Sequence, residues 1–192
     1  MKVIGISGSP RRGGNTDILL EEALRGAASR GAETEKIVLN ELKVSPCQEE
    51  EYENVNDEGL SVVDDDMRTV FRKVREADAL ILASPVFFGS LSAQTKIMID
   101  RFQCVWLAKN ILKRDVFAGR RAGGFICVEA TSREDFFDNA RSIVRHFFAT
   151  INVEYKKEVF CPGVAKKAAV LDHPNVLERA YELGRGIAGE AR

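Results

Sequence analysis

The residues best suited to chemistry lie in two short segments, each of which follows an apolar run. The first segment, residues 7–16, supplies hydroxyl, amide, guanidinium and unhindered backbone N–H groups where a helical pattern begins: Ser7, Ser9, Arg11, Gly14, Asn15 and Thr16. A helix start favours an anion because its first N–H groups lack partners and carry a partial positive charge. Arg11 or Arg12 can add charge-assisted hydrogen bonds, so this segment predicts a phosphate site.

The spacing of this loop excludes two common phosphate ligands. A P-loop needs G-x-x-x-x-G-K-[ST], but Gly14 and Asn15 stand where Lys and Ser/Thr would follow Gly13. A dinucleotide fingerprint needs G-x-G-x-x-G and an acidic residue after the second strand, and residues 38–40 offer none. We therefore expect a monophosphate. The alternative is a tight turn in which Asn15 caps the helix.

The second segment has the sequence SPVFFG and contains Ser84, Pro85, Val86, Phe87, Phe88 and Gly89. Pro85 restricts the backbone and Gly89 allows it to close into a turn. Backbone N–H groups beside the aromatic rings of Phe87 and Phe88 suit one edge and one face of a planar ring. The alternative is that the two rings only cap the core at a strand end.

The elements that position both segments alternate along the chain. Apolar strands are predicted at 3–6, 35–39, 79–83, 122–128 and 153–160, and helices at 16–30, from 64, at 91–107, 135–151 and 175–188. Strands separated by helices predict an α/β parallel sheet with helices on both faces. With 192 residues, we expect a single domain spanning 1–192, with a long acidic loop at about 40–63. That loop is either a solvated surface or a cover for the ligand or a neighbouring subunit.

The composition narrows the classes of partner. A net charge of −1 gives no general attraction to nucleic acid or anionic membranes. No apolar run approaches the ~18 residues of a membrane span, so we expect a cytoplasmic protein with no membrane partner. The four cysteines, Cys47, Cys104, Cys127 and Cys161, form no close pair, which indicates reduced thiols packed mostly in the core.

Three motifs together resemble a known family. They are G-S-P-R-x-x-G-N-T at 8–16, S-P-V-F-F-G at 84–89 and S-A-Q-x-K at 92–96. The chain looks like the flavodoxin-like NAD(P)H-dependent FMN reductase and iron-sulfur flavoprotein family. The resemblance implies a three-layer sandwich with a five-stranded parallel sheet of order 2-1-3-4-5. In that order the ends of strands one and three form the ligand-binding crevice.

The family resemblance also implies a cofactor and its contacts. FMN would place its phosphate on residues 7–16 and its ring against 84–89, with NAD(P)H as the co-substrate and a homodimer or homotetramer as the assembly. The family usually has a Gly-rich turn after strand four, whereas this chain has Thr131 and Arg133, of which Arg133 would stabilise reduced flavin. Only Cys47 matches the start of the cluster motif of the iron-sulfur members. Since a cluster takes four ligands, we expect none, and no other metal.

We therefore expect an FMN-binding NAD(P)H-dependent oxidoreductase that passes electrons to a small acceptor such as a quinone, a flavin or a metal complex. Flavin chemistry needs no catalytic side chain, which agrees with the lack of a triad. The first alternative is an FMN electron carrier that works between protein partners without nicotinamide turnover. The second is a protein that kept the fold and lost the flavin.

Overall fold

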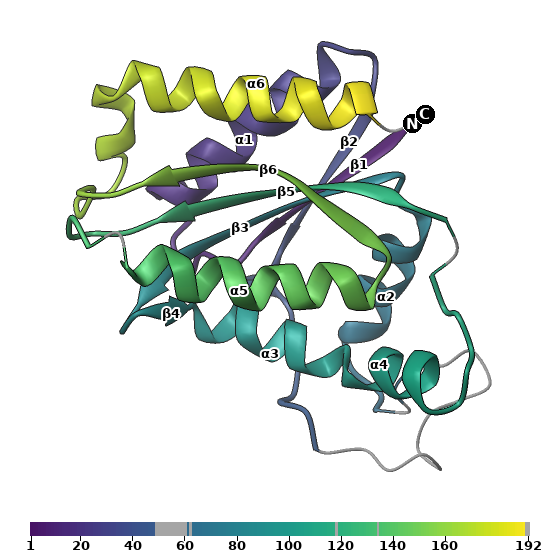
Figure 1. Cartoon of the computed structure of the whole chain (residues 1–192). Helices are drawn as coiled ribbons and strands as arrows, with labels where there is room; N and C mark the ends of the chain where they lie inside the picture. Colours follow the sequence, from purple (N-terminus) through teal and green to yellow (C-terminus); the bar gives the residue numbers. More distant parts are fainter. Residues whose placement is uncertain (49–60, 62, 118, 134, 191–192) are drawn as a thin grey trace.

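Five parallel strands form the central sheet of the computed structural model (Figure 1). Their order is β2 (Glu33–Val38), β1 (Lys2–Ser7), β3 (Ala79–Phe87), β5 (Arg121–Val128) and β6 (Val153–Cys161). The structure describes residues 1–48, 61, 63–117, 119–133 and 135–190. Because β5 and β6 are the fourth and fifth parallel strands, the expected order 2-1-3-4-5 is confirmed.

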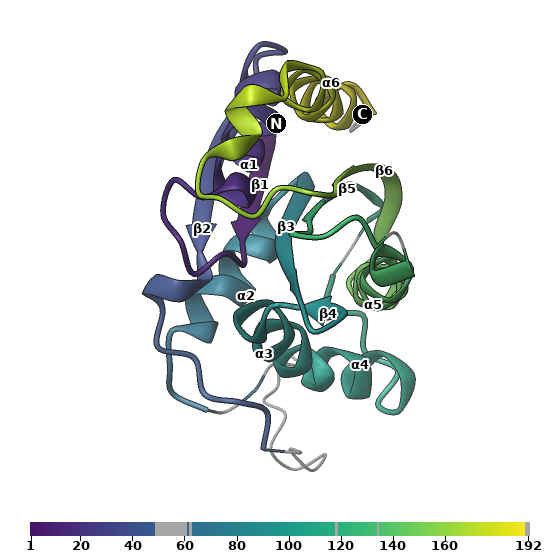
Figure 2. The same ribbon diagram turned by 90° about the vertical axis from the view of Figure 1, so that its left-hand side faces the viewer.

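Helices cover both faces of this sheet (Figure 2). The helices α1 (Asn15–Ala28) and α6 (Pro174–Glu190) lie on one face, and α2 (Met67–Glu76), α3 (Ala93–Arg101), α4 (Gln103–Asn110) and α5 (Asp135–Thr150) lie on the other. Two short 3-10 helices complete the described elements, η1 (Leu39–Glu41) and η3 (Ala169–Asp172). The fold is the flavodoxin-like sandwich expected from the sequence. Within the described ranges, no helix is long and apolar enough to cross a lipid bilayer.

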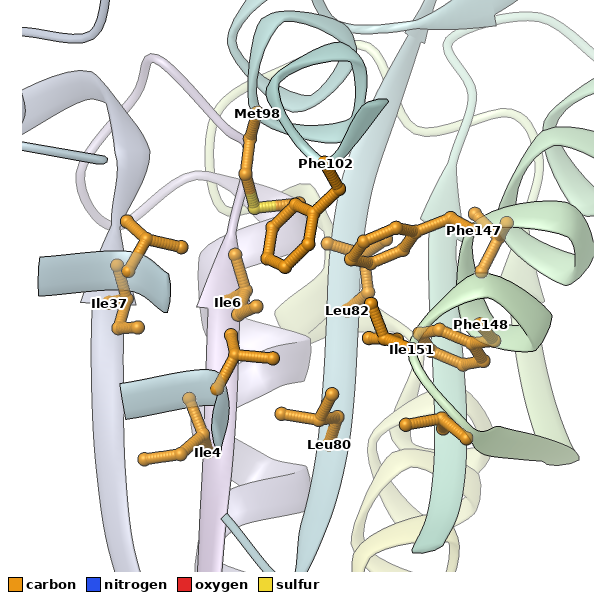
Figure 3. Close-up of a cluster of buried hydrophobic side chains, with 14 of the residues drawn as sticks. Ile4, Ile6, Ile37, Leu80, Leu82, Met98, Phe102, Phe147, Phe148 and Ile151 are labelled. Atoms are coloured by element: carbon orange, nitrogen blue, oxygen red, sulfur yellow. The ribbon is translucent and has the colours of Figure 1, made fainter. Parts of the chain in front are cut away.

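Alternate residues of the strands supply the two cores. Ile4 and Leu80 point toward the core under α2 to α5, as Figure 3 shows, whereas Val3 and Ile81 belong to the core under α1 and α6. These strands are apolar on both sides because both sides of the sheet are covered. The ring of Phe102 lies at the centre of the larger core.

The third strand is longer than the sequence predicted. We expected a strand over 79–83 and a turn from Ser84, but β3 continues to Phe87 and pairs with the short antiparallel β4 (Ser90–Leu91). β1 ends beside Ala83, so Pro85 pairs only with Val128 of β5 and lies on an edge of the sheet, where proline is tolerated. The turn itself is only Phe88 and Gly89, with φ values of 51° and 73°. Two left-handed residues between paired strands form a type I′ hairpin.

The helix predicted over 91–107 is also wrong as a single element. Leu91 belongs to β4, Ser92 caps α3, and Phe102 separates α3 from α4. Phe102 has a φ of −80° and a ψ of 5°, in the bridge region rather than the helical region. The periodicity of the apolar residues continues across this break, which is why the sequence indicated one helix.

The predicted acidic loop at 40–63 lies mostly outside the described residues, which omit 49–60 and 62. Its first part forms η1, and Cys47 is half-buried. Arg101 of α3, which is 1% exposed, donates hydrogen bonds to Ser45 O at 3.1 Å, Asp65 Oδ2 at 2.6 Å and Ser61 Oγ at 3.1 Å. One buried arginine therefore anchors both ends of this segment to the body of the protein.

Candidate functional site

The loop after β1 starts directly beside the extension of β3. The N–H of Gly8 donates to Ala83 O at 2.8 Å, which continues the pairing of the two strands by one residue. The loop then folds on itself: Ser9 Oγ accepts from Arg11 N at 3.2 Å, and Arg11 O accepts from Gly14 N at 3.1 Å. Gly13 has a φ of 60°, which glycine adopts without strain. The two sequence motifs are therefore neighbours at the carboxyl edge of the sheet.

A buried acid that sequence analysis missed supports this loop from below. Asp17, 5% exposed, accepts from Gly13 N at 2.9 Å and pairs with Lys36 Nζ at 3.1 Å. Ser7, predicted as a ligand residue, lies 3.5 Å from Asp17 through its hydroxyl and is buried. From the sequence, an acidic residue in the first helical turn indicates only a favourable interaction with the helix dipole. The hydrogen bond from Asp17 to the preceding loop could therefore not be predicted from its position in the sequence.

Asn15 uses its side chain in a way the sequence did not indicate. Its Nδ2 donates to Val164 O at 3.1 Å and to Lys166 O at 2.9 Å, and its Oδ1 accepts from Val170 N at 3.1 Å. The amide thus holds the segment that follows β6. It is not the cap of α1, because the cap position is Gly14. The backbone N–H of Asn15 remains the group through which it could contact an anion.

A cavity opens between the loop, the ends of β3 and β5, and the segment that follows β6. The sequence-predicted residues that line it are Ser9, Arg11, Gly14, Asn15, Thr16, Pro85, Val86 and Phe87. Lining residues that sequence analysis missed are Pro10, Val128, Ala130, Val164, Ala165 and Lys167. The remaining predicted residues, Ser7, Ser84, Phe88, Gly89, Thr131 and Arg133, are not among those that line it. The cavity thus has four walls: the loop after β1, the end of β3, the end of β5 with the turn that follows it, and the segment after β6. The first two walls are the two sequence motifs.

Ser84 lies in a buried group of hydroxyls instead. Its Oγ accepts from Ser92 N at 3.1 Å and from Thr95 Oγ1 at 3.1 Å, and Ser92 Oγ donates to Gly8 O at 2.6 Å. These residues connect the loop after β1, the end of β3 and the start of α3. Ser84 therefore belongs to a group of hydroxyls that links the loop after β1 to the end of β3, the two walls of the cavity that carry the sequence motifs.

Thr131 and Arg133, the two predicted residues in the turn after β5, bind other groups. Thr131 Oγ1 donates to the buried Glu129 carboxylate. Arg133 donates to Asp135 through Nε at 3.1 Å and Nη2 at 2.7 Å, and its guanidinium lies 4.5 Å from the Phe136 ring centroid. In this arrangement Arg133 binds residues at the start of α5, and it does not line the cavity.

The hairpin tip is held from one side and open on the other. Asn139 Nδ2 donates to Gly89 O at 2.8 Å, while Phe87 is 45% exposed and Phe88 is fully exposed. Phe87 is among the residues that line the cavity, and Phe88 is not.

The charge of the cavity suits an anion. Arg11 and Lys167 are its only charged lining residues in the described part of the chain. Arg12, the other candidate from the sequence, pairs with Glu41 at the surface. The loop after β1 and the α1 start supply Arg11 and the hydroxyls of Ser9 and Thr16, the segment after β6 supplies Lys167, and the end of β3 supplies Val86 and Phe87. This donor set and apolar wall fit a phosphate joined to a flat aromatic group.

The cysteines do not fit an iron-sulfur cluster. Cys104 and Cys127 are buried in the core under α2 to α5, and Cys161 is buried in the opposite core. Among the described residues, no three His, Cys, Asp or Glu side chains are grouped as metal ligands. Burial raises the pKa of the Cys127 and Cys161 thiols, whereas a cluster needs thiolates.

Comparison with known proteins places this geometry in context. Residues 1–150 match the family model described as NADPH-dependent FMN reductase. An iron-sulfur flavoprotein of Methanocaldococcus jannaschii is 48% identical over 101 residues, which are 53% of this chain and 51% of that protein. One from Methanosarcina thermophila is 38% identical over 124 residues, which are 65% of this chain and 64% of that protein. The matches therefore span about half to two thirds of these curated relatives.

Solved structures show the same fold. The NAD(P)H:quinone oxidoreductase from Methanothermobacter marburgensis superposes with a TM-score of 0.73 at 21% identity, over 97% of this chain and 95% of that one. A flavone reductase superposes with a TM-score of 0.74 at 22% identity, over 100% of this chain and 63% of that one. At these identities the likeness concerns the fold alone.

Proposed function

Because this chain belongs to the NADPH-dependent FMN reductase family, we propose that it binds FMN in the cavity and works as an NAD(P)H-dependent oxidoreductase with a small electron acceptor. The observation that carries the proposal is the cavity itself. It joins the loop after β1 to the end of β3, about seventy residues apart in the sequence, and its lining combines two cations, Arg11 and Lys167, with the aromatic residue Phe87. When bound, FMN supplies the redox chemistry by taking a hydride from a reduced nicotinamide and passing electrons on.

The residues of this chain bind and orient the cofactor. Ser9, Arg11 and Thr16, with the N–H groups at the α1 start, would hold the phosphate, since all of these donors come from the loop after β1 and the first turn of α1 and line the same cavity. The Pro85–Phe87 backbone and the Phe87 ring would contact the flavin ring and exclude water from one face. The hydrogen bonds among the buried hydroxyls of Ser84, Ser92 and Thr95 would hold this wall in position.

The experiment for this proposal is anaerobic mixing of the FMN-loaded protein with NADPH or NADH while the flavin absorbance is followed. The expected result is prompt bleaching with at least one nicotinamide, followed by reoxidation on addition of a quinone. Protein that takes up no FMN would refute the proposal. A matched pair of variants tests the site: Arg11→Ala should weaken FMN binding about tenfold or more, whereas Arg12→Ala should not, because Arg12 pairs with Glu41.

The second candidate function is an FMN electron carrier between protein partners. It is favoured by the relatives named iron-sulfur flavoproteins. Flavin that stays oxidised with both nicotinamides but accepts single electrons readily would support it. For either function we propose that no iron-sulfur cluster is present, which iron analysis of the purified protein tests. We also propose a homodimer or homotetramer, to be measured by light scattering.

A further inference from the structure

The fourth wall of the cavity comes from a segment outside the region that matches the family model. Residues 164–170 follow β6, and the model match ends at residue 150. In Figure 2 the connection from β6 to α6 runs beside the loop between β1 and α1. The three hydrogen bonds of Asn15, 9% exposed, fix this segment to the first turn of α1.

The backbone of residues 167–169 is held at both ends by the Asn15 side chain. Asn15 binds Lys166 O on one side and Val170 N on the other, so residues 167–169 form a short bridge. Within the bridge, Ala168 has a φ of 61°, in the left-handed region that non-glycine residues rarely occupy. Such a conformation persists only where the surroundings enforce it, and it concentrates at functional positions. The bridge is therefore a defined support for the residue before Ala168.

That residue is Lys167, whose exposed side chain lies at the rim of the cavity. Its Cε lies 3.8 Å from the position that a Cβ on Gly13 would occupy, so the stem of the lysine follows the turn of the loop. Arg11 reaches the same cavity from the loop. In the described part of the chain, neither Arg11 nor Lys167 forms an ion pair, whereas Arg12 does.

We propose that Lys167 is a ligand of the FMN 5′-phosphate and completes its site opposite Arg11. This inference rests on the proposed function. A phosphate monoester carries nearly two negative charges at neutral pH, and Arg11 supplies only one of the compensating charges. An ammonium group on a flexible stem adds the second charge without a fixed angular demand. The Asn15 amide then acts as a positioning group, because it holds the segment that carries the lysine.

The test compares Lys167→Gln with Lys166→Gln, an exposed neighbour that does not line the cavity. Binding of FMN and of riboflavin, which lacks the phosphate, is measured by quenching of flavin fluorescence at several salt concentrations. Lys167→Gln should weaken FMN binding about 10- to 100-fold, leave riboflavin binding unchanged and reduce the salt dependence for FMN. Lys166→Gln should match the unmodified protein with both ligands, and Lys167→Arg should retain most of the FMN affinity.

Two results would overturn the inference while the proposed function stands: unchanged FMN affinity in Lys167→Gln, or an equal loss for FMN and riboflavin. The second would indicate a change of cavity shape rather than a lost phosphate contact. Failure of the unmodified protein to bind FMN would instead remove the proposed function, and this inference with it.

Discussion

Gly8 is the most closely packed glycine of the loop after β1, so we expect Gly8→Ala to destabilise the protein and its ligand site together. A Cβ at this position would lie 1.8 Å from Thr95 Oγ1 and 3.1 Å from Ser92 Oγ. The first distance is far inside van der Waals contact, and both hydroxyls are completely buried. Overpacking of this kind costs about 1–3 kcal/mol. The glycine is needed because α3 approaches the loop, rather than for its backbone freedom.

The cause can be isolated with a second substitution. Thr95→Ala alone removes hydrogen bonds to Ser84 Oγ at 3.1 Å and Ser92 Oγ at 2.9 Å, at a cost of about 1–3 kcal/mol. In the double variant the new methyl group enters the space that Oγ1 leaves. Its total cost should therefore fall below the sum of the two single costs by about 1 kcal/mol or more.

The measurement is urea unfolding of the four proteins, followed by far-UV circular dichroism, with FMN affinity measured in parallel. The control is Gly189→Ala in α6, where a Cβ would meet only Arg30 Nη2 at 3.9 Å and where alanine favours the helix. This variant should be as stable as the unmodified protein or more so. Strict additivity of Gly8→Ala and Thr95→Ala would refute the reasoning, because it would show that the methyl group and the hydroxyl do not compete for the same space.

Three further outcomes are expected. Arg121→Met should lower the free energy of unfolding, measured with urea, by at least about 2 kcal/mol. The reason is that the buried guanidinium donates to carbonyls at the C-terminal ends of both α2 and α5. A loss within about 0.5 kcal/mol, as at an ordinary surface site, would contradict this role. Although burial opposes it, the Ser45 N–H and the Arg101 guanidinium lower the pKa of Asp65, so its ionised form is favoured in the folded state. The stability difference between the unmodified protein and Asp65→Asn should be full at pH 7 and shrink as the pH falls below about 4; a constant difference down to pH 3 would show that the charge is not involved. With iodoacetamide at pH 8, the half-buried Cys47 should be the first thiol alkylated in the folded protein, since burial raises the pKa of Cys127; mass spectrometry showing early modification of Cys127 would be the opposite result.

The sequence by itself determined the alternation of strands and helices, the order of the parallel strands by resemblance, and most of the cavity lining. Apolar strands buried on both faces and a polar loop at a helix start are local patterns, and they depend only on the few residues that form them. Ser9, Arg11 and Pro85, which these patterns singled out, line the cavity, and their contact with a cofactor stays a prediction. The same local reading extended one helix through Phe102, because continuous periodicity does not reveal where a chain bends.

Only the tertiary structure decided which polar groups face the cavity and which support it. Ser84 turned out to bind Ser92 and Thr95, and the Asn15 amide binds groups 149 to 155 residues away. Lys167 lies near the loop because the parallel strands β1 and β6 both end at the carboxyl side of the sheet, so the segments that follow them meet there. Hydrogen-bond partners so distant in the chain leave no mark in local residue spacing, because strand order and helix packing bring them together.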